Sequence, residues 1–502
     1  MNLADAIDTL RELVVEPPPA GITDVRPLAA VAYDSRRVGP AALFVALKGL
    51  KADGVAFAEQ AVARGAQAVI AETPAPAGIA VPWVVVRDAR LALALLADRF
   101  FDHPSRRMPV IGVTGTNGKT TTAYLLTAML DQAGLRAGML GTVAYRIGGE
   151  DREASRTTPE APDVQQLLSE MLRHGNKSAV MEVSSHALSL KRVDGMRFAA
   201  AVFSNLTRDH LDFHADMEAY FAAKRRLFEM LPRDAPAVIN LDDPRGASLV
   251  EISGRPVTYA ITAPADVRPG PVAMTLNGLQ FEVATPRGTV RIQSKLVGRP
   301  NVYNILAATA TAVSLDVPID AIERGVAGLA GVPGRFEVVS GAGDDVTAVV
   351  DYAHTDDALR NLLETARPLG ARRLVTVFGC GGDRDRSKRP LMGMVAARLS
   401  DVVVITSDNP RSEDPKRIIE EIERGIPAGS QSSRTPTVVA VVDRAEAIER
   451  AIAMAEAGDV VLVAGKGHEK YQQIGDRVLP FDDSDVARAA LARRRRAGAK
   501  GS

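Results

Sequence analysis

Cysteine is almost absent from this sequence: Cys380 is the single one in 502 residues. One cysteine cannot form an intramolecular disulfide, which excludes the small disulfide-stabilised domains and fits a reducing compartment. Long apolar runs are also missing, since none approaches the ~20 residues that a membrane-spanning helix needs. The N-terminal segment carries acidic residues where a secretion signal needs positive charge. We therefore expect a soluble cytoplasmic protein without a membrane segment.

A net charge is lacking as well, because 61 lysine and arginine residues balance 61 aspartate and glutamate residues. A chain without a net field is not typical of proteins that bind nucleic acids or anionic membranes, so we expect neither partner. The one strong local charge block is Arg493–Arg496. Because this block lies beside the C-terminus, we predict a solvated tail there.

The length of 502 residues exceeds what one core can serve, and roughly 150 residues per domain predicts about three domains. We place them at 1–88, 89–333 and 334–502. The first segment predicts a small N-terminal α/β domain. The second alternates apolar β-type runs with helical patterns, which predicts a central P-loop-type parallel sheet with helices and an antiparallel appendage around Asn277-Gly278. The third predicts a C-terminal Rossmann-like doubly wound α/β domain. We expect a monomer.

The segment VIGVTGTNGKTTT, Val110–Thr122, has the order of strand, glycine-rich turn and helix that is typical of a P-loop. Backbone N–H groups and the helix N-terminus supply positive potential there. Lys119 can reach the terminal phosphates of a nucleotide, and Thr120 offers a hydroxyl to Mg²⁺. The generic motif has its first glycine at position 113, which is valine here. The loop therefore predicts nucleotide binding by a distinct group of P-loop proteins.

The hexapeptide Gly-Thr-Asn-Gly-Lys-Thr in this loop resembles the corresponding loop of the Mur ligase superfamily, which also includes folylpolyglutamate synthases. These enzymes use ATP to activate a carboxylate as an acyl phosphate, and an amine then displaces the phosphate. The resemblance implies ATP contacts from Gly115, Thr116, Asn117, Gly118, Lys119, Thr120 and Thr121.

Two further segments follow apolar strands and crowd metal-binding side chains together. MEVSSHAL places Glu182 at the end of a strand, and TRDHLDFH brings His210, Asp212 and His214 close in sequence. Open α/β sheets bind ligands at this edge. The spacing of the two histidines alone is compatible with zinc. Beside a phosphate loop, a hard cation such as Mg²⁺ with few protein ligands is favoured.

Lys224 lies in a helical pattern, AYFAAKRRLFEML, at the centre of an apolar arc. A lysine at such a position either extends past its apolar neighbours to solvent or is functional. Burial favours the neutral amine, which can react with CO₂. The matching Tyr-x-x-Ala-Lys segment of Mur ligases carries a carbamylated lysine. The resemblance therefore implies an N6-carboxylated Lys224, with Thr120, Glu182 and His210 as the other metal ligands and Lys119, His210 and Lys224 as catalytic residues.

The resemblance covers nearly the whole chain. DSRRVGPAALFVALKGLKADG and TTPEAPD resemble the parts that bind the UDP-linked substrate, and GRPNVYNILAA, GVPGRFE and DYAHTDDAL resemble the ATP-side motifs. Leu50, Leu190 and Asp356 depart from the residues that are usual in the family. The implied substrate contacts are Ser35, Lys51, Ala52, Thr157, Thr158, Ser184 and Arg192. The implied further nucleotide contacts are Asn301, Arg335, Asp351 and His354.

The stretch TSDNPRSEDP follows an apolar run and has the composition of a turn before a helix. A turn alone does not explain Arg411 beside a proline. Meso-diaminopimelate differs from lysine by one carboxylate, and a guanidinium binds a carboxylate through two parallel hydrogen bonds. Within the family, the DNPR sequence marks the diaminopimelate-adding enzymes. The resemblance implies an amino-acid pocket of Arg389, Asp408, Asn409, Pro410, Arg411, Gly465 and Glu469.

Together these segments imply a ligase that uses ATP and Mg²⁺ to join meso-diaminopimelate to the D-Glu γ-carboxylate of UDP-N-acetylmuramoyl-L-Ala-D-Glu during peptidoglycan precursor synthesis. Folylpolyglutamate synthesis is the alternative within the family, although it explains neither the N-terminal block nor DNPR. A P-loop hydrolase or nucleotide-sensing module is the alternative from another class. A ligase hydrolyses ATP only when both co-substrates are present, which separates the two classes.

Overall fold

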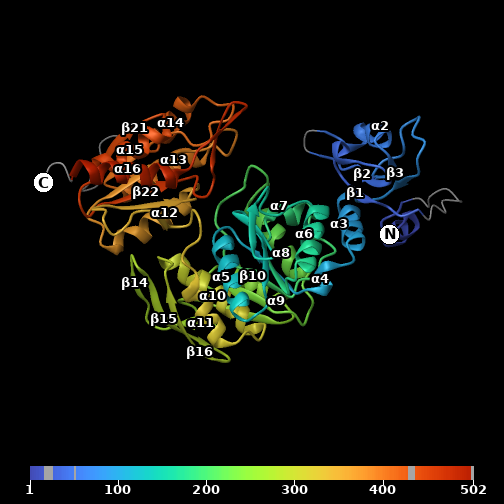
Figure 1. Ribbon diagram of the computed structural model, residues 1–502, viewed down its shortest axis with the longest axis horizontal. Helices are drawn as coiled ribbons and strands as arrows, with labels where there is room; N and C mark the ends of the chain where they lie inside the picture. The colour runs from blue at the N-terminus through green and yellow to red at the C-terminus, as the bar shows by residue number, and fades with distance from the viewer. Residues whose placement is uncertain (16–25, 50–51, 428–435, 499–502) are drawn as a thin grey trace.

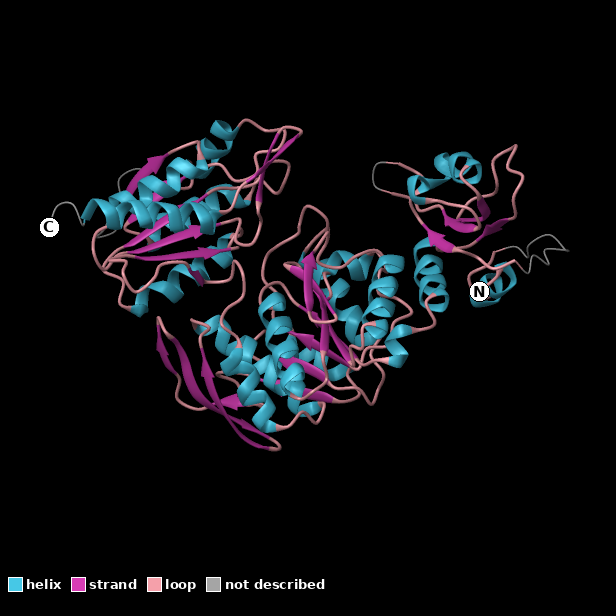
Figure 2. Ribbon diagram, viewed as in Figure 1, coloured by secondary structure: helices cyan, strands magenta, loops and turns pink. Residues whose placement is uncertain are grey.

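The computed structural model describes residues 1–15, 26–49, 52–427 and 436–498. The described chain forms three bodies, with the N-terminal and C-terminal bodies on opposite sides of a central one (Figure 1). Each body has its own parallel or mostly parallel sheet flanked by helices (Figure 2). Within the described residues, no helix is both long and apolar enough to cross a bilayer. The three-body α/β fold predicted from the sequence is confirmed.

The N-terminal body is a small parallel sheet in the order β1-β2-β3-β4. Its strands are β1 (Ala30–Ala32), β2 (Ala42–Val45), β3 (Ala66–Ala71) and β4 (Trp83–Val85). Its helices are α1 (Leu3–Thr9), η1 (Ser35–Arg37), η2 (Gly54–Phe57) and α2 (Ala58–Ala63). The chain then enters the central body through α3 (Ala89–Phe100) and the single turn α4 (Pro104–Arg107).

The central body is an eight-stranded sheet, in the order β12-β11-β10-β5-β9-β6-β7-β8, in which β7 runs antiparallel to both of its neighbours. Its strands are β5 (Val110–Thr114), β6 (Ala137–Leu140), β7 (Ala144–Ile147), β8 (Glu150–Glu153), β9 (Ser178–Glu182), β10 (Ala200–Phe203), β11 (Ala237–Asn240) and β12 (Pro256–Tyr259). Because β10, β5 and β9 are parallel neighbours, the loops after them meet at one edge of the sheet.

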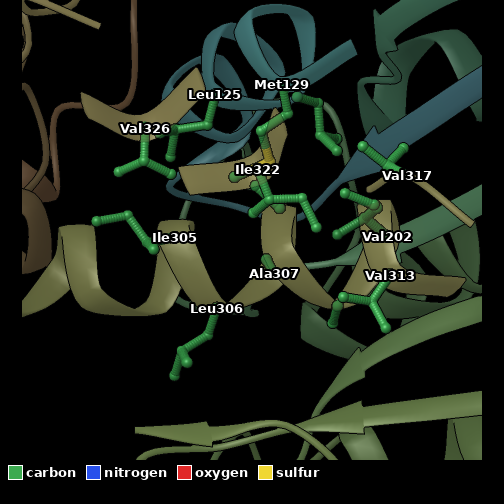
Figure 3. Close-up of a cluster of buried hydrophobic side chains, with 14 of the residues drawn as sticks. Leu125, Met129, Val202, Ile305, Leu306, Ala307, Val313, Val317, Ile322 and Val326 are labelled. Atoms are coloured by element: carbon green, nitrogen blue, oxygen red, sulfur yellow. The ribbon is translucent and has the colours of Figure 1, made fainter. Parts of the chain in front are cut away.

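Helices cover both faces of this sheet. They are α5 (Lys119–Gln132), α6 (Ala161–Arg173), α7 (Ser185–Ser189), α8 (Met217–Glu229), α9 (Gly246–Ile252), α10 (Arg299–Ser314) and α11 (Ile319–Gly328). Figure 3 shows α5, α10 and α11 meeting through Leu125, Ile305 and Ile322. Gly325 allows α11 to pass close to α5, since a β-carbon there would stand 2.6 Å from the Met129 Cα. This core fixes α5, and with it the glycine-rich loop at its start.

The antiparallel appendage lies beside α10 and α11. Its strands are β13 (Arg268–Pro269), β14 (Ala273–Thr275), β15 (Gly278–Thr285) and β16 (Gly288–Ser294). The pairing of β14 with β15 around Asn277 confirms the predicted hairpin. The longer pairing, between β15 and β16, turns at Pro286-Arg287.

The C-terminal body is a sheet in the order β17-β18-β22-β19-β20-β21, in which only β17 is antiparallel. Its strands are β17 (Glu337–Val338), β18 (Thr347–Asp351), β19 (Leu374–Phe378), β20 (Val402–Ile405), β21 (Thr437–Ala440) and β22 (Val460–Ala464), and a separate hairpin is formed by β23 (Tyr471–Ile474) and β24 (Arg477–Pro480). Its helices are α12 (Asp356–Ala366), η3 (Arg367–Leu369), α13 (Lys388–Leu399), α14 (Pro415–Glu423), α15 (Arg444–Met454) and α16 (Asp483–Gly498). Side chains of α12, α13 and α14 fill one core, and those of α15 and α16 fill another on the opposite face. The sheet is therefore doubly wound.

The prediction of a tail is wrong for the basic run, which is helical, although the predicted exposure to solvent is confirmed for Arg493, Arg495 and Arg496. Arg493–Arg496 belongs to α16, and three of its arginines are paired with acids elsewhere in the body. Arg493 lies 2.7 Å from Glu449, Arg494 lies 2.7 Å from Asp345, and Arg495 pairs with Asp344. Carboxylates distant in sequence thus pair with a charge run that lies, largely exposed, on a helix.

One fully buried ion pair supports the C-terminal body and yields a stability prediction. The side chains of Arg444 and Asp483 are both 0% exposed, with the arginine Nη2 2.7 Å from the Asp483 Oδ2. Replacing Asp483 with asparagine would leave a buried cation unpaired, so we expect a loss of about 3–5 kcal/mol in unfolding free energy. Urea unfolding followed by circular dichroism would measure it.

Asp485→Asn is the matched control, because Asp485 lies in the first turn of the same helix and its side chain is 74% exposed. An exposed pair contributes roughly 0–1 kcal/mol. Equal effects of the two substitutions would show that the Arg444 pair does not stabilise the body.

Candidate active site

The glycine-rich loop after β5 takes a conformation that only glycine allows at two positions. Gly115 has φ +145°, and a β-carbon there would stand 1.9 Å from the Ser204 Oγ. Gly118 has φ +88°, and a β-carbon would stand 2.4 Å from the Asn304 Oδ1. The loop is therefore packed against the segment after β10 and against α10. Its predicted members Thr120 and Thr121 are buried in the first turn of α5.

Two lysines from different elements converge on one carbonyl of this loop. Lys119 Nζ donates to the Gly115 carbonyl at 2.9 Å and to the Thr116 carbonyl at 2.8 Å. Lys224 Nζ donates to the same Gly115 carbonyl at 2.7 Å. Two ammonium groups on one oxygen repel each other, which favours the loss of one charge. The predicted catalytic lysines are thus brought together.

Lys224 is the more deeply placed of the two. Its side chain is 1% exposed in the buried face of α8, as the helical arc predicted. Its Nζ lies 4.3 Å from the centre of the Tyr220 ring. Burial first, and the charge of Lys119 second, hold the pKa of Lys224 well below its usual value. A neutral amine at physiological pH is the form that reacts with CO₂.

Oxygen ligands collect beside these lysines at the end of β9. Glu182 is 1% exposed, and its Oε2 accepts from the Thr120 hydroxyl at 3.0 Å and from the Thr142 hydroxyl at 3.0 Å. A buried carboxylate next to a hydroxyl suits a hard cation that keeps several water or phosphate ligands. These residues therefore fit Mg²⁺. In the described residues, no group of three or more His, Cys, Asp and Glu side chains is arranged to hold a metal.

The predicted histidines lie in a cluster of rings after β10. His210 has φ +54°, and its ring centre lies 4.8 Å from that of His186. Burial lowers the pKa of His210 to about 3, so the ring is neutral and can act as a ligand. The ring of His214 bonds a different residue, with its Nε2 2.9 Å from the Ser185 Oγ. Asp209, which the sequence reasoning did not select, lies 3.5 Å from His210.

The predicted nucleotide residues from later motifs divide into two groups. Arg335 reaches the glycine-rich loop directly, because its Nη2 donates to the Thr120 hydroxyl at 3.3 Å. Asn301 is one step removed, as its Oδ1 accepts from Asn304, which lies against Gly118. Asp351 and His354 instead bond to nearby backbone groups.

Asp351 accepts from the Phe336 amide at 2.7 Å, which fixes the segment that carries Arg335. Burial raises the pKa of Asp351 even though the Arg335 cation lowers it. The His354 Nδ1 lies 2.9 Å from the Tyr352 carbonyl. Asp351 thus supports the segment between the central and C-terminal bodies, and His354 bonds within the loop after β18.

Four residues predicted to contact the UDP-linked substrate lie around the end of β9. The Thr158 hydroxyl donates to the Glu182 carbonyl at 2.8 Å and accepts from the Ser184 amide at 3.1 Å. Arg192 donates to the Thr158 carbonyl at 3.0 Å. Thr157 reaches Thr142 at 3.1 Å. These side chains stand beside the predicted metal ligands.

The remaining predicted substrate residues are in the N-terminal body. Ser35 is buried and donates to the Gln60 Oε1 at 2.7 Å, and Ala52 is exposed. Lys51 lies outside the described residues. A hollow of about 360 Å³ separates this body from the central one, with Arg37 and Arg156 in its lining. The Tyr33 hydroxyl donates across it to Asp163 at 2.6 Å.

The DNPR loop follows β20, and its backbone conformation sets the orientation of Arg411. Arg411 has φ +50°, and its backbone pairs with the β23–β24 hairpin on both sides, from its amide to the Gln473 carbonyl at 3.2 Å and from the Gly475 amide to its carbonyl at 2.7 Å. Its side chain donates to the Gly382 carbonyl at 2.7 Å. The turn is therefore clamped, and the guanidinium keeps further donors for a ligand.

Other predicted pocket residues surround this loop. Asn409 donates to the Glu469 Oε2 at 2.9 Å, and Asp408 and Pro410 are buried beside it. Gly465, with φ +120°, lies so close to Asp408 that a β-carbon would stand 2.7 Å from the Asp408 Oδ2. Gly465 is thus required by packing.

Arg389 differs from the predicted picture of a free ligand-binding side chain. It is 0% exposed, and its guanidinium donates to Glu413 at 2.8 and 2.9 Å, to Glu421 at 2.8 Å and to the Gly381 carbonyl at 3.1 Å. Its Nε alone lacks a partner. Direct contact with a ligand stays a prediction for Arg389, and in this state it fixes the segments on either side of Arg411.

Side-chain hydrogen bonds join the central and C-terminal bodies at the site. Arg208 donates to Asp385 at 3.1 Å, Asn117 donates to Asp357 at 3.4 Å, and Arg335 reaches Thr120 as described above. The glycine-rich loop therefore faces the body that carries DNPR. The arrangement can bring an activated phosphate and an amino-acid pocket to one reaction space.

Comparisons with known proteins found similarity over nearly the whole chain. Models of the Mur ligase family, catalytic domain, of the Mur ligase middle domain and of the Mur ligase glutamate ligase domain match residues 27–101, 113–312 and 334–467. The UDP-N-acetylmuramoyl-L-alanyl-D-glutamate--2,6-diaminopimelate ligase of Solibacter usitatus (strain Ellin6076) is 49% identical over 496 residues, which cover 98% of both chains. The enzyme of the same name from Gloeobacter violaceus is 48% identical, covering 94% of this chain and 95% of that one.

This chain belongs to the Mur ligase family. A solved structure of a UDP-N-acetylmuramoyl-L-alanyl-D-glutamate--2,6-diaminopimelate ligase is 35% identical, with a TM-score of 0.68 over 96% of this Mur ligase and 97% of that chain. MurF from Acinetobacter baumannii is 21% identical, with a TM-score of 0.65 over 91% and 94% of the two chains, and shares the fold.

The structure also assigns supporting contacts to residues that the sequence reasoning passed over. Thr142 bonds Glu182, Glu413 bonds Arg389, and Lys466 bonds Asn409. Lys466 lies between the predicted pocket residues Gly465 and Glu469, and Glu413 lies within TSDNPRSEDP. A charged residue beside predicted pocket residues was the available signal. Thr142 carried no such signal, because it lies in the loop after β6, 40 positions before Glu182 in the sequence.

Proposed function

We propose that this Mur ligase joins meso-diaminopimelate to the D-Glu γ-carboxylate of UDP-N-acetylmuramoyl-L-Ala-D-Glu, with ATP as co-substrate. The observation that carries the proposal is the clamped DNPR loop in the body that faces the glycine-rich loop through Arg335 and Thr120. The name shared by relatives of 45–49% identity supports the same reaction.

The reaction has two balanced steps. An oxygen of the substrate γ-carboxylate attacks the γ-phosphorus of ATP, the bond to the bridging oxygen breaks, and ADP leaves. The amine of the amino acid then attacks the acyl carbon, loses a proton, and releases inorganic phosphate. Such transfers depend on positioning and on neutralisation of phosphate charge. Lys119, once released from the Gly115 and Thr116 carbonyls, supplies that charge from the glycine-rich loop.

Magnesium is the cofactor that the ligand set fits. Thr120, Glu182, His210 and a carbamylated Lys224 would hold it, and it would supply charge neutralisation at the phosphates. Carbamylation turns the neutral Lys224 amine into an anion beside the Lys119 cation, so the two side chains at the Gly115 carbonyl attract each other. The buried amine and its lowered pKa support this assignment.

The three predicted domains, 1–88, 89–333 and 334–502, would share the binding of the three substrates. The N-terminal domain with Ser35 and the β9 edge with Thr158 and Arg192 hold the UDP-linked substrate, the central domain holds ATP, and the C-terminal domain holds the amino acid. Because no single sheet carries all the groups, the C-terminal domain must close over the central one for ligation.

Phosphate release from ATP with each co-substrate omitted in turn would test the proposal. The ligase requires both UDP-N-acetylmuramoyl-L-Ala-D-Glu and meso-diaminopimelate for sustained release. Steady turnover of ATP alone would instead indicate a P-loop hydrolase. Glutamate transfer to a folate, without activity on the UDP-linked substrate, would indicate a folylpolyglutamate synthase.

A further inference from the structure

The loop after β22 contains a lysine with no contact to solvent. Lys466 is 0% exposed, and its Nζ donates to the Asn409 Oδ1 at 2.8 Å and to the Tyr471 carbonyl at 2.7 Å. One cation thus joins three segments of the amino-acid pocket: its own loop, the DNPR loop and the β23–β24 hairpin. The hairpin is the element that clamps the backbone of Arg411.

Lys466 also lies between two carboxylates of the pocket. Its Nζ is 3.6 Å from the Asp408 Oδ1 and 3.7 Å from the Glu469 Oε2. In the described part of the chain, no other lysine or arginine lies within ion-pair distance of either carboxylate. Arg444, on the other side of Asp408, is already paired with Asp483. Lys466 is therefore the cation that offsets the charges of Asp408 and Glu469.

We propose that Lys466 is a positioning residue of the amino-acid pocket: it offsets the charge of Asp408, so that Glu469 stays ionised and can accept the ammonium group of the incoming diamino acid. This inference rests on the proposed ligase function. It concerns amino-acid binding alone, so substitution of Lys466 leaves the ATP and UDP-substrate sites intact.

The surroundings of Glu469 set the direction of the effect. Burial and the nearby Asp408 raise the pKa of Glu469, and the Lys466 cation and the Asn409 hydrogen bond lower it. Without Lys466, the carboxylate faces Asp408 unscreened and takes up a proton more readily. The titratable and charged groups that face Glu469 are Tyr352, Asp408, Arg411, Arg444, Lys466 and Tyr471.

The test is the KM for meso-diaminopimelate in Lys466→Met at pH 7 and pH 9. At pH 7 we expect an increase of roughly 10- to 100-fold, as for the loss of a hydrogen bond to a charged group. The ratio of variant to wild-type KM should fall at least about fivefold by pH 9, because Glu469 ionises again as pH rises. KM values for ATP and for the UDP-linked substrate should stay within about twofold.

Two further comparisons separate charge balance from support of the loop. In an Asp408→Asn background, Lys466→Met should raise KM much less than it does in the wild type, because the charge that Lys466 offsets is gone. Lys470→Met is the matched control, because Lys470 lies four residues on with its side chain 78% exposed. It should match the wild type at both pH values.

A KM ratio that does not change with pH, together with an equal effect of Lys466→Met in the wild-type and Asp408→Asn backgrounds, would reduce Lys466 to structural support and overturn the proposal. An unchanged KM in Lys466→Met would overturn it as well. If Lys466→Met does not fold by circular dichroism, the comparison of the double variant with Asp408→Asn decides alone: a further rise in KM below 10-fold supports charge balance, and a rise above 10-fold contradicts it. A wild-type enzyme that forms no tripeptide product overturns the proposed function itself.

Discussion

Lys224→Ala is expected to lower the ligation rate by roughly 10³-fold or more, because it removes the group whose carbamate would hold the metal at the phosphates. The geometry behind this expectation is specific. Lys224 is 1% exposed on the inner face of α8, and it shares the Gly115 carbonyl with Lys119. Steady-state ligation assays would measure the loss.

Bicarbonate or acetate should restore part of the activity of Lys224→Ala, since a small carboxylate can occupy the space of the carbamate. Arg225→Ala is the matched control, because the adjacent Arg225 has a 41% exposed side chain that pairs with Glu229. It should stay within about twofold of the wild type. Full activity of Lys224→Ala without added carboxylate would exclude the carbamate.

Arg411→Ala is expected to lower kcat/KM for meso-diaminopimelate by roughly 100-fold or more. A guanidinium that binds the second carboxylate contributes ~3 kcal/mol to the choice between diaminopimelate and lysine. The φ of +50° and the backbone hydrogen bonds to the hairpin hold Arg411 in one orientation. KM values for ATP and the UDP-linked substrate should change by less than about twofold.

Arg417→Ala provides the control for this prediction, because Arg417 is an exposed arginine at the start of α14. It should behave as the wild type. An equal loss of ATP binding and diaminopimelate use in Arg411→Ala would mean that the arginine supports the fold of the loop, and would remove it from the specificity pocket.

The parts of the site that were predictable from sequence are those encoded locally. The glycine-rich loop is formed by consecutive residues. The burial of Lys224 follows from the helical periodicity of its apolar neighbours, which lie on one face of α8. The hairpin at Asn277-Gly278 follows from turn chemistry. Each of these features depends on residues within about one helix or one turn.

The parts that were not predictable depend on contacts between distant segments. The pairing of Arg411 with the β23–β24 hairpin joins residues more than 60 positions apart. Arg389 in α13 pairs with Glu413, which precedes α14, and with Glu421 within α14. For the same reason the basic run in α16 was misread, because its partners Asp344, Asp345 and Glu449 lie far away in sequence. A charge pattern alone does not reveal which charges will be neutralised.

The most direct test of the account is the product formed when the wild-type enzyme receives ATP, UDP-N-acetylmuramoyl-L-Ala-D-Glu and equal amounts of meso-diaminopimelate and lysine. Mass spectrometry distinguishes the two possible tripeptide products. The account predicts that the diaminopimelate product exceeds the lysine product by roughly 100-fold or more, in line with the contribution of Arg411. A predominant lysine product, or no tripeptide in either form, would contradict it.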